Sequence, residues 1–364
     1  MTSTVEAGLA AALAPFSEAS GLLVAVSGGP DSMALLRLVA GWAERCDHPP
    51  IHAATVDHRL RPGSRAEAET VALWAEAVGI PHAILTWDGE KPATRIQERA
   101  RAARYGLLAA HAERIGADVL MTAHHADDQA ETILFRLLRG SAIAGLAGMA
   151  PVTWRGKLRL ARPLLGWSKA DLVALCEAAG QPFFCDPSNE DPRYARTRMR
   201  RLTALFAAQG FGRDAILRLA FRLARAEAAL TELTQAAQAR LAAERTAGSF
   251  TVRAGDLAEL ADEVILRILV AEVERIGRRP HAPRLERAEA LLAVLRPALR
   301  QGGTFAGTLG GTLIRLDNGR LTIGAERRRG AAGQAKLQAP LGLAERKSDC
   351  CHDEDQPFPW QGTS

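Results

Sequence analysis

The stretch VAVSGGPDSMALL, residues 24–36, decides how the first half of the chain folds. A run of apolar residues ends at Ser27, two glycines follow, and a helical pattern of apolar residues begins at once. Glycines let backbone N–H groups crowd around an anion, and the start of a helix adds a partial positive charge. We therefore predict a phosphate-binding turn between a strand and a helix. The competing interpretation is a plain turn in which Ser27 or Asp31 caps the helix.

The polar side chains of this turn fit a phosphate ligand that is accompanied by a metal ion. Ser27 and Ser32 can donate hydrogen bonds to phosphate oxygens, whereas the carboxylate of Asp31 repels them. A Mg²⁺ ion that bridges Asp31 and a phosphate removes this repulsion. No lysine follows the glycines, so the turn is not a Walker A loop.

Around the turn, short apolar runs alternate with longer helical patterns over residues 21–135. Continuous apolar runs are typical of strands that are covered on both faces, and helices between them indicate a parallel sheet. The predicted fold class is therefore α/β, with a doubly wound parallel sheet. The predicted strands are 21–26, 51–57, 82–87 and 117–123, and the predicted helices are 31–45, 64–78 and 94–115. Ligands of such sheets bind beyond the carboxyl ends of the strands, where the glycine turn lies.

The whole chain is predicted to form a catalytic first domain, a mostly helical second domain and a tail. The first domain is placed at 1–210 and includes a glycine-rich flexible loop at 140–151. The second is placed at 211–326, and residues 327–364 lack periodicity and are predicted to be disordered. Further helices are predicted at 169–179, 194–208, 212–245 and 255–296, and short hairpin strands within 302–324.

Composition limits the class of protein without identifying it. The chain has 364 residues and a net charge of +5, which permits a polyanionic partner but does not demand one. Its five cysteines form no C-x-x-C pair, so neither a disulfide framework nor a zinc site is predicted, and a reducing cytoplasm fits best. No stretch approaches the ~18 apolar residues that span a bilayer, so no membrane attachment is predicted. The sequence does not predict an oligomeric state.

The string SGGPDS, residues 27–32, resembles the pyrophosphatase loop, or PP-loop, of the N-type ATP pyrophosphatases. These enzymes cleave ATP between its α and β phosphates and place AMP on an oxygen of their substrate. The resemblance implies that ATP is bound by Ser27, Gly28, Gly29, Pro30, Asp31 and Ser32. It also implies that Asp31 holds Mg²⁺ and acts in catalysis. Asp57 and His58 end the second predicted strand and are expected to contact the adenosine half of ATP, the alternative for Asp57 being a cap of the next turn.

Six further stretches resemble the tRNA(Ile)-lysidine synthases and follow the order of that family over roughly residues 20–205. They are VDHRLR (56–61), ARAARY (100–105), TAHHADDQAET (122–132), RPLL (162–165), DPSN (186–189) and YARTRMR (194–200). The resemblance implies that ATP, with Mg²⁺, adenylates the oxygen on carbon 2 of the wobble cytidine in the tRNA(Ile) with a CAU anticodon. The ε-amine of free L-lysine then displaces AMP and gives lysidine. The modified base pairs with A instead of G, and the tRNA accepts isoleucine instead of methionine.

Two carboxylates in HHADDQAET are the candidate lysine ligands. Asp128 and Glu131 are three residues apart and share one face of a helix that begins near Asp127. Together they can hold an ammonium group, hold a second metal ion or deprotonate the amine. The simpler interpretation is that Asp127 and Asp128 are first-turn acids, which the helix dipole favours, and that Glu131 is solvated. The resemblance favours binding of lysine, and catalysis, by Asp128 and Glu131. His124 and His125 end the preceding strand, where they either face the ligand or lie buried and hydrogen-bonded.

A dense run of arginines in DPRYARTRMRR is the candidate tRNA-binding segment. Such crowded like charges are costly unless a polyanion approaches, although a solvated basic face is the simpler interpretation. The resemblance favours tRNA binding by Arg196, Arg198, Arg200 and Arg201. Thr197 stands where that family leads us to expect asparagine. A weaker basic stripe, at Arg218, Arg222 and Arg225, either faces tRNA or is an ordinary helix surface.

Two other functions fit part of the sequence. Another PP-loop enzyme that adenylates tRNA shares the loop, but the thiolases of this group need a cysteine pair that Cys176 and Cys185 do not form. The second is an inactive RNA-binding relative, which an altered loop would indicate. Ser27, Asp31 and Ser32 are all present here, and this argues against it.

Overall fold

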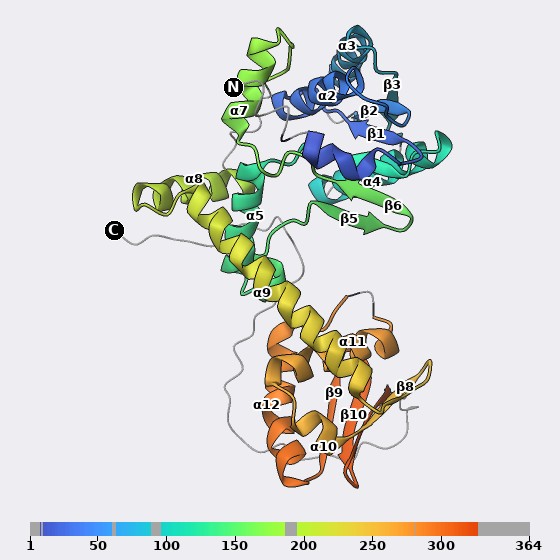
Figure 1. The fold of residues 1–364 in the computed structure, drawn as a ribbon, viewed down its shortest axis with the longest axis vertical. Helices are drawn as coiled ribbons and strands as arrows, with labels where there is room; N and C mark the ends of the chain where they lie inside the picture. Colours follow the sequence, from blue (N-terminus) through green and yellow to red (C-terminus); the bar gives the residue numbers. More distant parts are fainter. Residues whose placement is uncertain are drawn as a thin grey trace. The chain divides into compact units, whose positions relative to one another are not determined.

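The computed structural model describes residues 10–59, 63–88, 96–185, 195–279 and 281–326, together with Gly8. The chain forms two compact units, which meet in sequence between Phe221 and Arg222 (Figure 1). The second unit also takes in Gly140–Leu146. The domain limits derived from the sequence remain a prediction, and the predicted tail lies outside the described residues.

The first unit is built on a six-stranded sheet in the order β3-β2-β1-β4-β6-β5. The strands are β1 Leu22–Ala25, β2 Ile51–Asp57, β3 His82–Thr86, β4 Val119–Met121, β5 Val152–Arg155 and β6 Leu158–Ala161. All neighbouring pairs are parallel except β5 and β6, which form an antiparallel hairpin at one edge. The four predicted strands and the parallel sheet are confirmed. The strands β5 and β6 were not predicted.

Helices cover both faces of this sheet because successive residues of a strand point to opposite faces. The helices of this unit, after the short 3-10 turn η1 Ala14–Phe16, are α2 Pro30–Ala43, α3 Ser64–Ala77, α4 Ile96–Arg114, α5 Ala126–Leu138, α7 Lys169–Ala178 and α8 Ala195–Ala208. Leu22 and Val24 of β1 pack with α2, α3 and α7, whereas Leu23 and Ala25 pack with α4. The doubly wound arrangement predicted from the sequence is therefore confirmed.

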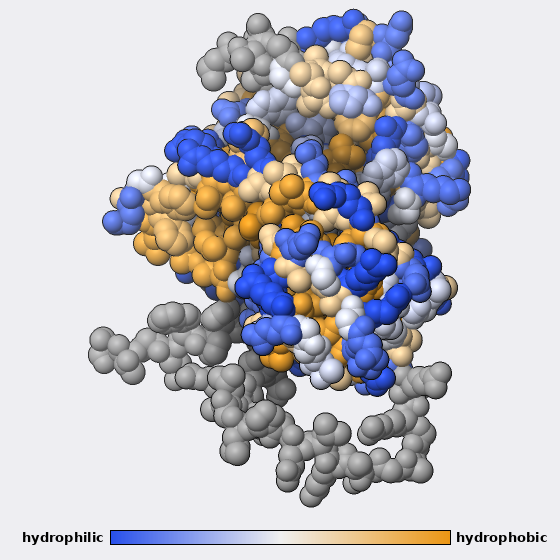
Figure 2. Space-filling view, turned by 60° about the horizontal axis from the view of Figure 1, so that its bottom comes forward, coloured by the Kyte–Doolittle hydropathy of each residue, from blue (hydrophilic) through white to orange (hydrophobic). Residues whose placement is uncertain are grey.

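A third apolar cluster joins α5, α8 and the first turns of α9, Arg213–Arg240. Ile133 of α5, Met199 of α8 and Ile216 of α9 are its buried members from each helix. The carboxyl-terminal part of α8 exposes Leu205 and Phe206, and the hydrophobic area at the left of Figure 2 lies where Figure 1 places this helix. The predicted helix 212–245 is confirmed in its position, but it ends at Arg240 and not at residue 245, because β7 begins at Glu244.

The second unit combines helices with a five-stranded antiparallel sheet in the order β7-β8-β11-β10-β9. Its elements after α9 are β7 Glu244–Arg245, β8 Ser249–Arg253, α10 Ala254–Ala258, α11 Asp262–Gly277, α12 Leu285–Gln301, β9 Phe305–Leu309, β10 Thr312–Asp317 and β11 Arg320–Ala325. The hairpin strands predicted within 302–324 are present, whereas β7 and β8 were not predicted. The glycine-rich segment predicted as a flexible loop contains a short helix, α6 Ile143–Leu146.

No helix among the described residues is both long and apolar enough to cross a membrane.

Candidate active site

The glycine turn joins β1 to α2 and has a shape that only glycine tolerates at its centre. Gly28 has a φ of +82°, and a Cβ atom there would lie 2.8 Å from Val71 and 2.9 Å from Phe184. Gly29 is the N-cap of α2, and Pro30 is the first residue of the helix. The strand, the tight turn and the helix start predicted from residues 24–36 are thus all present.

Ser32 holds this turn together from the first turn of α2. Its hydroxyl donates to the carbonyl of Gly29 at 3.0 Å and accepts from the backbone N–H of Ser27 at 3.0 Å. The hydroxyl of Ser27 lies 3.2 Å from that of Ser32. Ser32 is buried, whereas Ser27 is exposed. Of the two serines, Ser27 is therefore the one whose hydroxyl is open to a ligand.

A cavity of about 430 Å³ lies beyond the carboxyl ends of the strands and against this turn. Of the residues predicted from the sequence it is lined by Ser27, Gly29, Pro30, Asp31, Ser32, His58, His124, His125, Asp128 and Arg200. Arg101, Arg104 and Tyr105 of α4 and Lys169 of α7 complete its polar wall. Asp57 and Glu131 are not among the lining residues.

Asp31 places one carboxylate oxygen where a hard cation fits. Its Oδ1 atom is buried and has no hydrogen-bond partner, whereas Oδ2 lies 3.6 Å from His125 Nε2 and 3.8 Å from Lys169 Nζ. The described residues include no group of three or more His, Cys, Asp or Glu that could hold a metal ion. Magnesium commonly binds through one or two carboxylates together with substrate phosphates and waters. The donor set thus fits a Mg²⁺ ion that arrives with a nucleotide.

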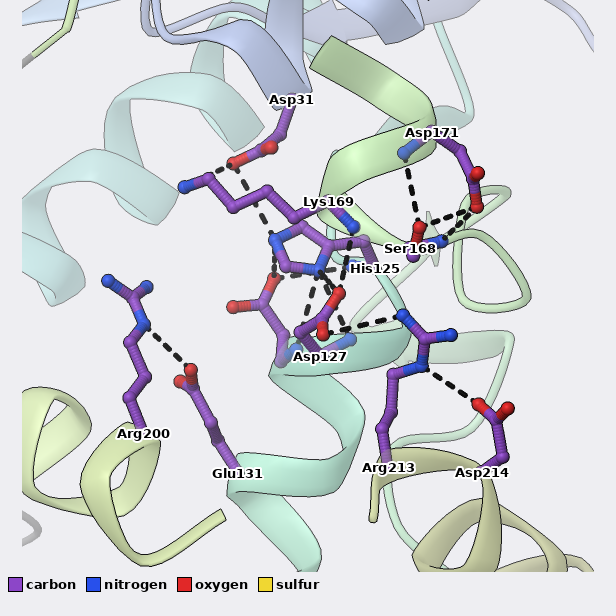
Figure 3. A network of polar contacts seen from close by, with 11 residues as sticks. Asp31, His125, Asp127, Glu131, Ser168, Lys169, Asp171, Arg200, Arg213 and Asp214 are labelled. Atoms are coloured by element: carbon purple, nitrogen blue, oxygen red, sulfur yellow. Dashed lines mark hydrogen bonds and ion pairs between the residues drawn. The ribbon is translucent and has the colours of Figure 1, made fainter. Parts of the chain in front are cut away.

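His125 is the N-cap of α5 and connects the aspartates around the cavity (Figure 3). Its Nδ1 atom accepts the backbone N–H groups of Asp127 at 3.2 Å and Asp128 at 3.5 Å, and Asp128 in turn accepts the N–H of His125 at 3.2 Å. Burial disfavours the imidazolium, but the hydrogen bonds to Asp127 and Asp31 and the charge of Asp128 raise the pKa of His125 to about 9. When Nδ1 carries a proton, it can no longer accept the two N–H groups that it caps. It then forms an ion pair with the carboxylate of Asp127, 3.5 Å away.

Asp127 ties the start of α5 to the start of α7. Its Oδ2 atom accepts the backbone N–H of Lys169 at 2.8 Å, and its Oδ1 atom lies 3.6 Å from Arg213 of α9. The hydrogen bond to His125 is the largest influence on this carboxyl and holds the pKa of Asp127 at about 2. The charged carboxylate of Asp127 therefore holds the backbone of Lys169 and positions this residue at the cavity.

The two predicted lysine ligands lie one turn apart on α5 but face different surroundings. Asp128 lines the cavity, and its carboxylate lies 3.5 Å from His125 Nε2. Glu131 is buried and accepts a hydrogen bond from Arg200 Nε of α8 at 2.8 Å. Burial opposes the charge of Arg200, but its bond to Glu131 raises the pKa of the guanidinium. Glu131 therefore holds Arg200, which does line the cavity.

The two residues at the end of β2, Asp57 and His58, also face different surroundings. Asp57 is buried and accepts the hydroxyl of Ser64 at 2.7 Å and the N–H of Arg59 at 3.0 Å. Burial opposes its ionisation, but these bonds keep the pKa of Asp57 below its usual value. The turn-capping alternative therefore describes its contacts. His58 lines the cavity and stands edge-on to Trp87, with ring centroids 6.0 Å apart.

The predicted tRNA-binding arginines lie at the start of α8. Arg198 and Arg200 are half-buried, and Arg201 is exposed. The side chain of Arg196 lies outside the described part of the chain, as do Arg61, Arg193 and the DPSN stretch. Sequence reasoning missed Lys169, because its only signal was a position within the capping box of α7, which Ser168 and Asp171 form.

Comparisons with known proteins agree with this geometry. Residues 1–205 match the PP-loop domain family. The chain is 49% identical over 314 residues to a tRNA(Ile)-lysidine synthase of a Methylobacterium species, covering 85% of this chain and 90% of that protein. It is 48% identical over 311 residues to that of Methylobacterium nodulans, covering 85% and 91%.

The U34-tRNA thiolase NcsA from Methanococcus maripaludis has a similar fold, with a TM-score of 0.53 and 16% identity over 61% of this chain and 79% of that one. At that identity the likeness concerns the fold alone. The family of PP-loop proteins implies the use of ATP. Matches at nearly half identity along most of both chains settle the closer relationship: the chain belongs to the tRNA(Ile)-lysidine synthase family.

Proposed function

We propose that this protein ligates free L-lysine to carbon 2 of the wobble cytidine in the tRNA(Ile) with a CAU anticodon. One observation carries the proposal: a PP-loop aspartate, Asp31, and a helix-start aspartate, Asp128, share one cavity in a chain of this family. The first is suited to activation by ATP and the second to an amine. The proposed site of action is the cytoplasm, where tRNA, ATP and lysine occur together.

In the proposed first step, the turn from Ser27 to Ser32 binds the polyphosphate of ATP. Backbone N–H groups at the start of α2 and the Ser27 hydroxyl face the anion, and Lys169 adds a positive charge. Asp31 would hold Mg²⁺, which offsets the charge that develops between the α and β phosphates. The oxygen on carbon 2 of the cytidine attacks the α phosphate, and pyrophosphate leaves with the electron pair of the broken bond. His58 is proposed to contact the adenosine half.

In the proposed second step, lysine displaces AMP from the activated base. Asp128 is suited to hold the ε-ammonium group and to accept its proton, because its carboxylate lines the cavity and carboxylates form strong hydrogen bonds with ammonium groups. We propose that Glu131 contributes to the same pocket through Arg200, whose guanidinium suits the carboxylate of lysine. The ε-nitrogen forms the new bond to carbon 2, and the oxygen departs with AMP.

The proposed tRNA contacts are the arginines at the start of α8, of which Arg198, Arg200 and Arg201 are described. Guanidinium groups bind phosphates in a bidentate way and give affinity without reading sequence. Arg196 belongs to the same proposal from its place in the sequence.

The test is incorporation of labelled lysine by the purified protein with ATP, Mg²⁺ and a tRNA(Ile) transcript that carries the CAU anticodon. A transcript with uridine in place of the wobble cytidine is the matched control. We expect lysine in the first transcript and none in the second. Pyrophosphate release without lysine incorporation, while a known synthase is active in parallel, would overturn the proposal and favour a different adenylating enzyme.

A further inference from the structure

Four arginines crowd together beside the cavity without a role in the steps above. They are Arg101 of α4, Arg136 of α5, Arg155 of β5 and Arg162, which follows β6. Burial is the largest cause that lowers the pKa of Arg162; Tyr105 opposes it, and the charges of Arg101, Arg155 and Arg136 each lower the pKa by a smaller amount. Arg101 and Arg155 both lie at the ring of Tyr105, and their positive charges act on Arg162, so that an anion between these three side chains is favoured.

Carbonyl groups and an aromatic ring hold these arginines in place. Arg162 donates to the carbonyl of Ala150 at 2.7 Å and to the hydroxyl of Thr153 at 3.2 Å. Arg136 donates to the carbonyl of Gly148 at 2.9 Å. These bonds fix the positions of the side chains, and the partners of Arg162 are a carbonyl and a hydroxyl, which carry no net charge.

The ring of Tyr105 connects the cluster to the cavity. The guanidinium carbon of Arg155 lies 4.2 Å from the centre of this ring and that of Arg101 lies 5.4 Å from it. Tyr105 is buried, and it lines the cavity together with Arg101. Arg155 is exposed. The cluster therefore reaches from the wall of the cavity to the solvent.

The arginines that line or adjoin the Tyr105 ring differ from others of the first unit in their lack of acidic partners within the described residues. Arg101, Arg155 and Arg162 form no ion pair with any residue of the described ranges, and the Nε atom of Arg162 is buried without a hydrogen-bond partner. Other arginines of the first unit, such as Arg65 and Arg159, have acidic partners. A buried donor without a partner costs free energy unless a ligand supplies the acceptor.

We propose that Arg101, Arg155 and Arg162 form a binding site for a backbone phosphate of the RNA strand whose base enters the cavity. This inference rests on the proposed function, since it assumes that a nucleotide is the acceptor of AMP. A base can reach the cavity only if its strand runs past the rim, where the phosphates next to that base must be bound. A phosphate held at fixed guanidinium groups determines which nucleotide of the loop reaches Asp31.

The shared chemistry is a phosphate group, and the polyphosphate of ATP is the other possible source. The two sources differ in salt dependence and in kinetics. Removal of one contact to an RNA phosphate lowers the slope of log Kd against log salt by ~0.7 to 0.9. A contact to ATP raises the KM for ATP and leaves that slope unchanged.

The experiment measures tRNA binding to full-length variants between 50 and 200 mM salt, together with the KM for ATP. Arg155→Gln is the main variant because the side chain is exposed and folding does not depend on it. We expect the rise of Kd across this salt range to shrink by about threefold, which corresponds to one lost contact. Arg155→Lys keeps the charge and is expected to keep the salt slope, and Arg162→Gln should lower it as Arg155→Gln does.

The matched control is Arg114→Gln, which removes one positive charge from the far end of α4, about 20 Å along the helix from Arg101. It is expected to leave the slope at the wild-type value. An unchanged slope in Arg155→Gln overturns the inference, and so does a raised KM for ATP with normal tRNA binding. If the wild type incorporates lysine while the slope is unchanged, only this inference fails. If the wild type binds no tRNA, the proposed function fails with it.

Discussion

At the scale of single residues, the two oxygens of Asp31 face different neighbours. Oδ2 lies near His125 and Lys169, whereas the buried Oδ1 has no partner in the protein. An unsatisfied buried oxygen costs free energy. A cation bound at Oδ1 would remove this cost, which explains why the oxygen has no partner within the protein.

Asp31→Asn is expected to lower lysine incorporation and pyrophosphate release by about 100-fold or more, since the variant loses the charge that holds Mg²⁺. The fold should survive, because the side chain is partly exposed and its amide is nearly the same size. Turnover and the urea midpoint are measured side by side. Asp47→Asn, on the exposed surface, is the control. Normal turnover in Asp31→Asn would remove Asp31 from the metal role.

Asp128→Asn and Glu131→Gln are expected to raise the KM for lysine by about tenfold or more, the effect of losing a charged hydrogen bond. The Kd for tRNA should change by less than about twofold in Asp128→Asn, since this carboxylate is not proposed to contact phosphate and, unlike Glu131, does not hold Arg200 by a hydrogen bond. Asp214→Asn removes a nearby but exposed carboxylate and should behave as the wild type. Weaker tRNA binding with an unchanged KM for lysine would show that the lysine pocket is misplaced.

Residue-level prediction from the sequence succeeded where a function is carried by neighbours in the chain. Ser27, Asp31 and His58 lie at the cavity as the motifs indicate. The pair between Glu131 and Arg200 joins residues 69 positions apart, and no local pattern reports such a contact. Lys169 was missed for the same reason, because its backbone is held by Asp127 from another helix.

At the scale of elements, the turn between β1 and α2 is fixed by its surroundings as well as by its own sequence. The carbonyl of Gly28 accepts the N–H of Phe184, and a side chain at Gly28 would collide with Val71 and Phe184. The positive φ is thus a requirement of the packing between the turn, α3 and the segment after α7.

Gly28→Ala is expected to destabilise the protein more than Gly79→Ala does. Both glycines have a positive φ, +82° and +74°, so both substitutions carry the left-handed cost of ~1 to 2 kcal/mol. Only Gly28 adds a collision, which we expect to cost about 1 to 3 kcal/mol more, because no atom lies within 4 Å of a Cβ at Gly79. Urea unfolding of both variants measures the difference. Equal losses would mean that the turn relaxes freely.

The contact between β2 and β3 predicts how stability depends on pH. His82 lies 2.8 Å from the Thr55 hydroxyl through Nε2, and burial, with a smaller contribution from His111, lowers the pKa of His82 to about 4. In the unfolded chain the pKa is ~6.5. The unfolded state therefore takes up the proton first, and stability is full above pH 6.5 and is lost as the pH falls towards 4.

This loss amounts to at most about 3 kcal/mol for the 2.5 units between the two pKa values. Unfolding free energies at pH 7.5 and 4.5 are compared for the wild type and for His82→Gln, which keeps a polar partner for Thr55. The variant is expected to lose less stability on acidification, because it lacks this titration. An identical loss in both proteins would mean that His82 does not contribute.

Element-level prediction depended on the length and regularity of each pattern. The strands from β1 to β4 and the helices between them were predicted because both faces of the sheet are covered, which gives long apolar runs. The strands β5 and β6 have only four residues each, and β5, at the sheet edge, is largely exposed, so the hairpin gives no long apolar run. The two-residue strand β7 exists only through its pairing with β8, which no local pattern contains.

At the scale of the whole molecule, the proposed chemistry depends on bringing distant motifs to one edge of a sheet. The cavity is lined from β1 and α2, the end of β2, α4, the end of β4, α5, α7 and α8, which span residues 25–200. The parallel topology makes this possible because all of its carboxyl ends meet on one side. The order of motifs in the sequence therefore predicted a shared site, whereas the side-chain pairs within it needed the three-dimensional structure.

The central claim is that activation of the tRNA by ATP precedes the arrival of lysine. The most direct measurement incubates the protein with CAU-anticodon tRNA(Ile) and ATP labelled in its α phosphate, with no lysine present. We predict label on the tRNA of the wild type, none with Asp31→Asn, and release of that label as AMP when lysine is added. Lysine incorporation without any labelled tRNA intermediate, or labelled tRNA that lysine leaves unchanged, would contradict the account.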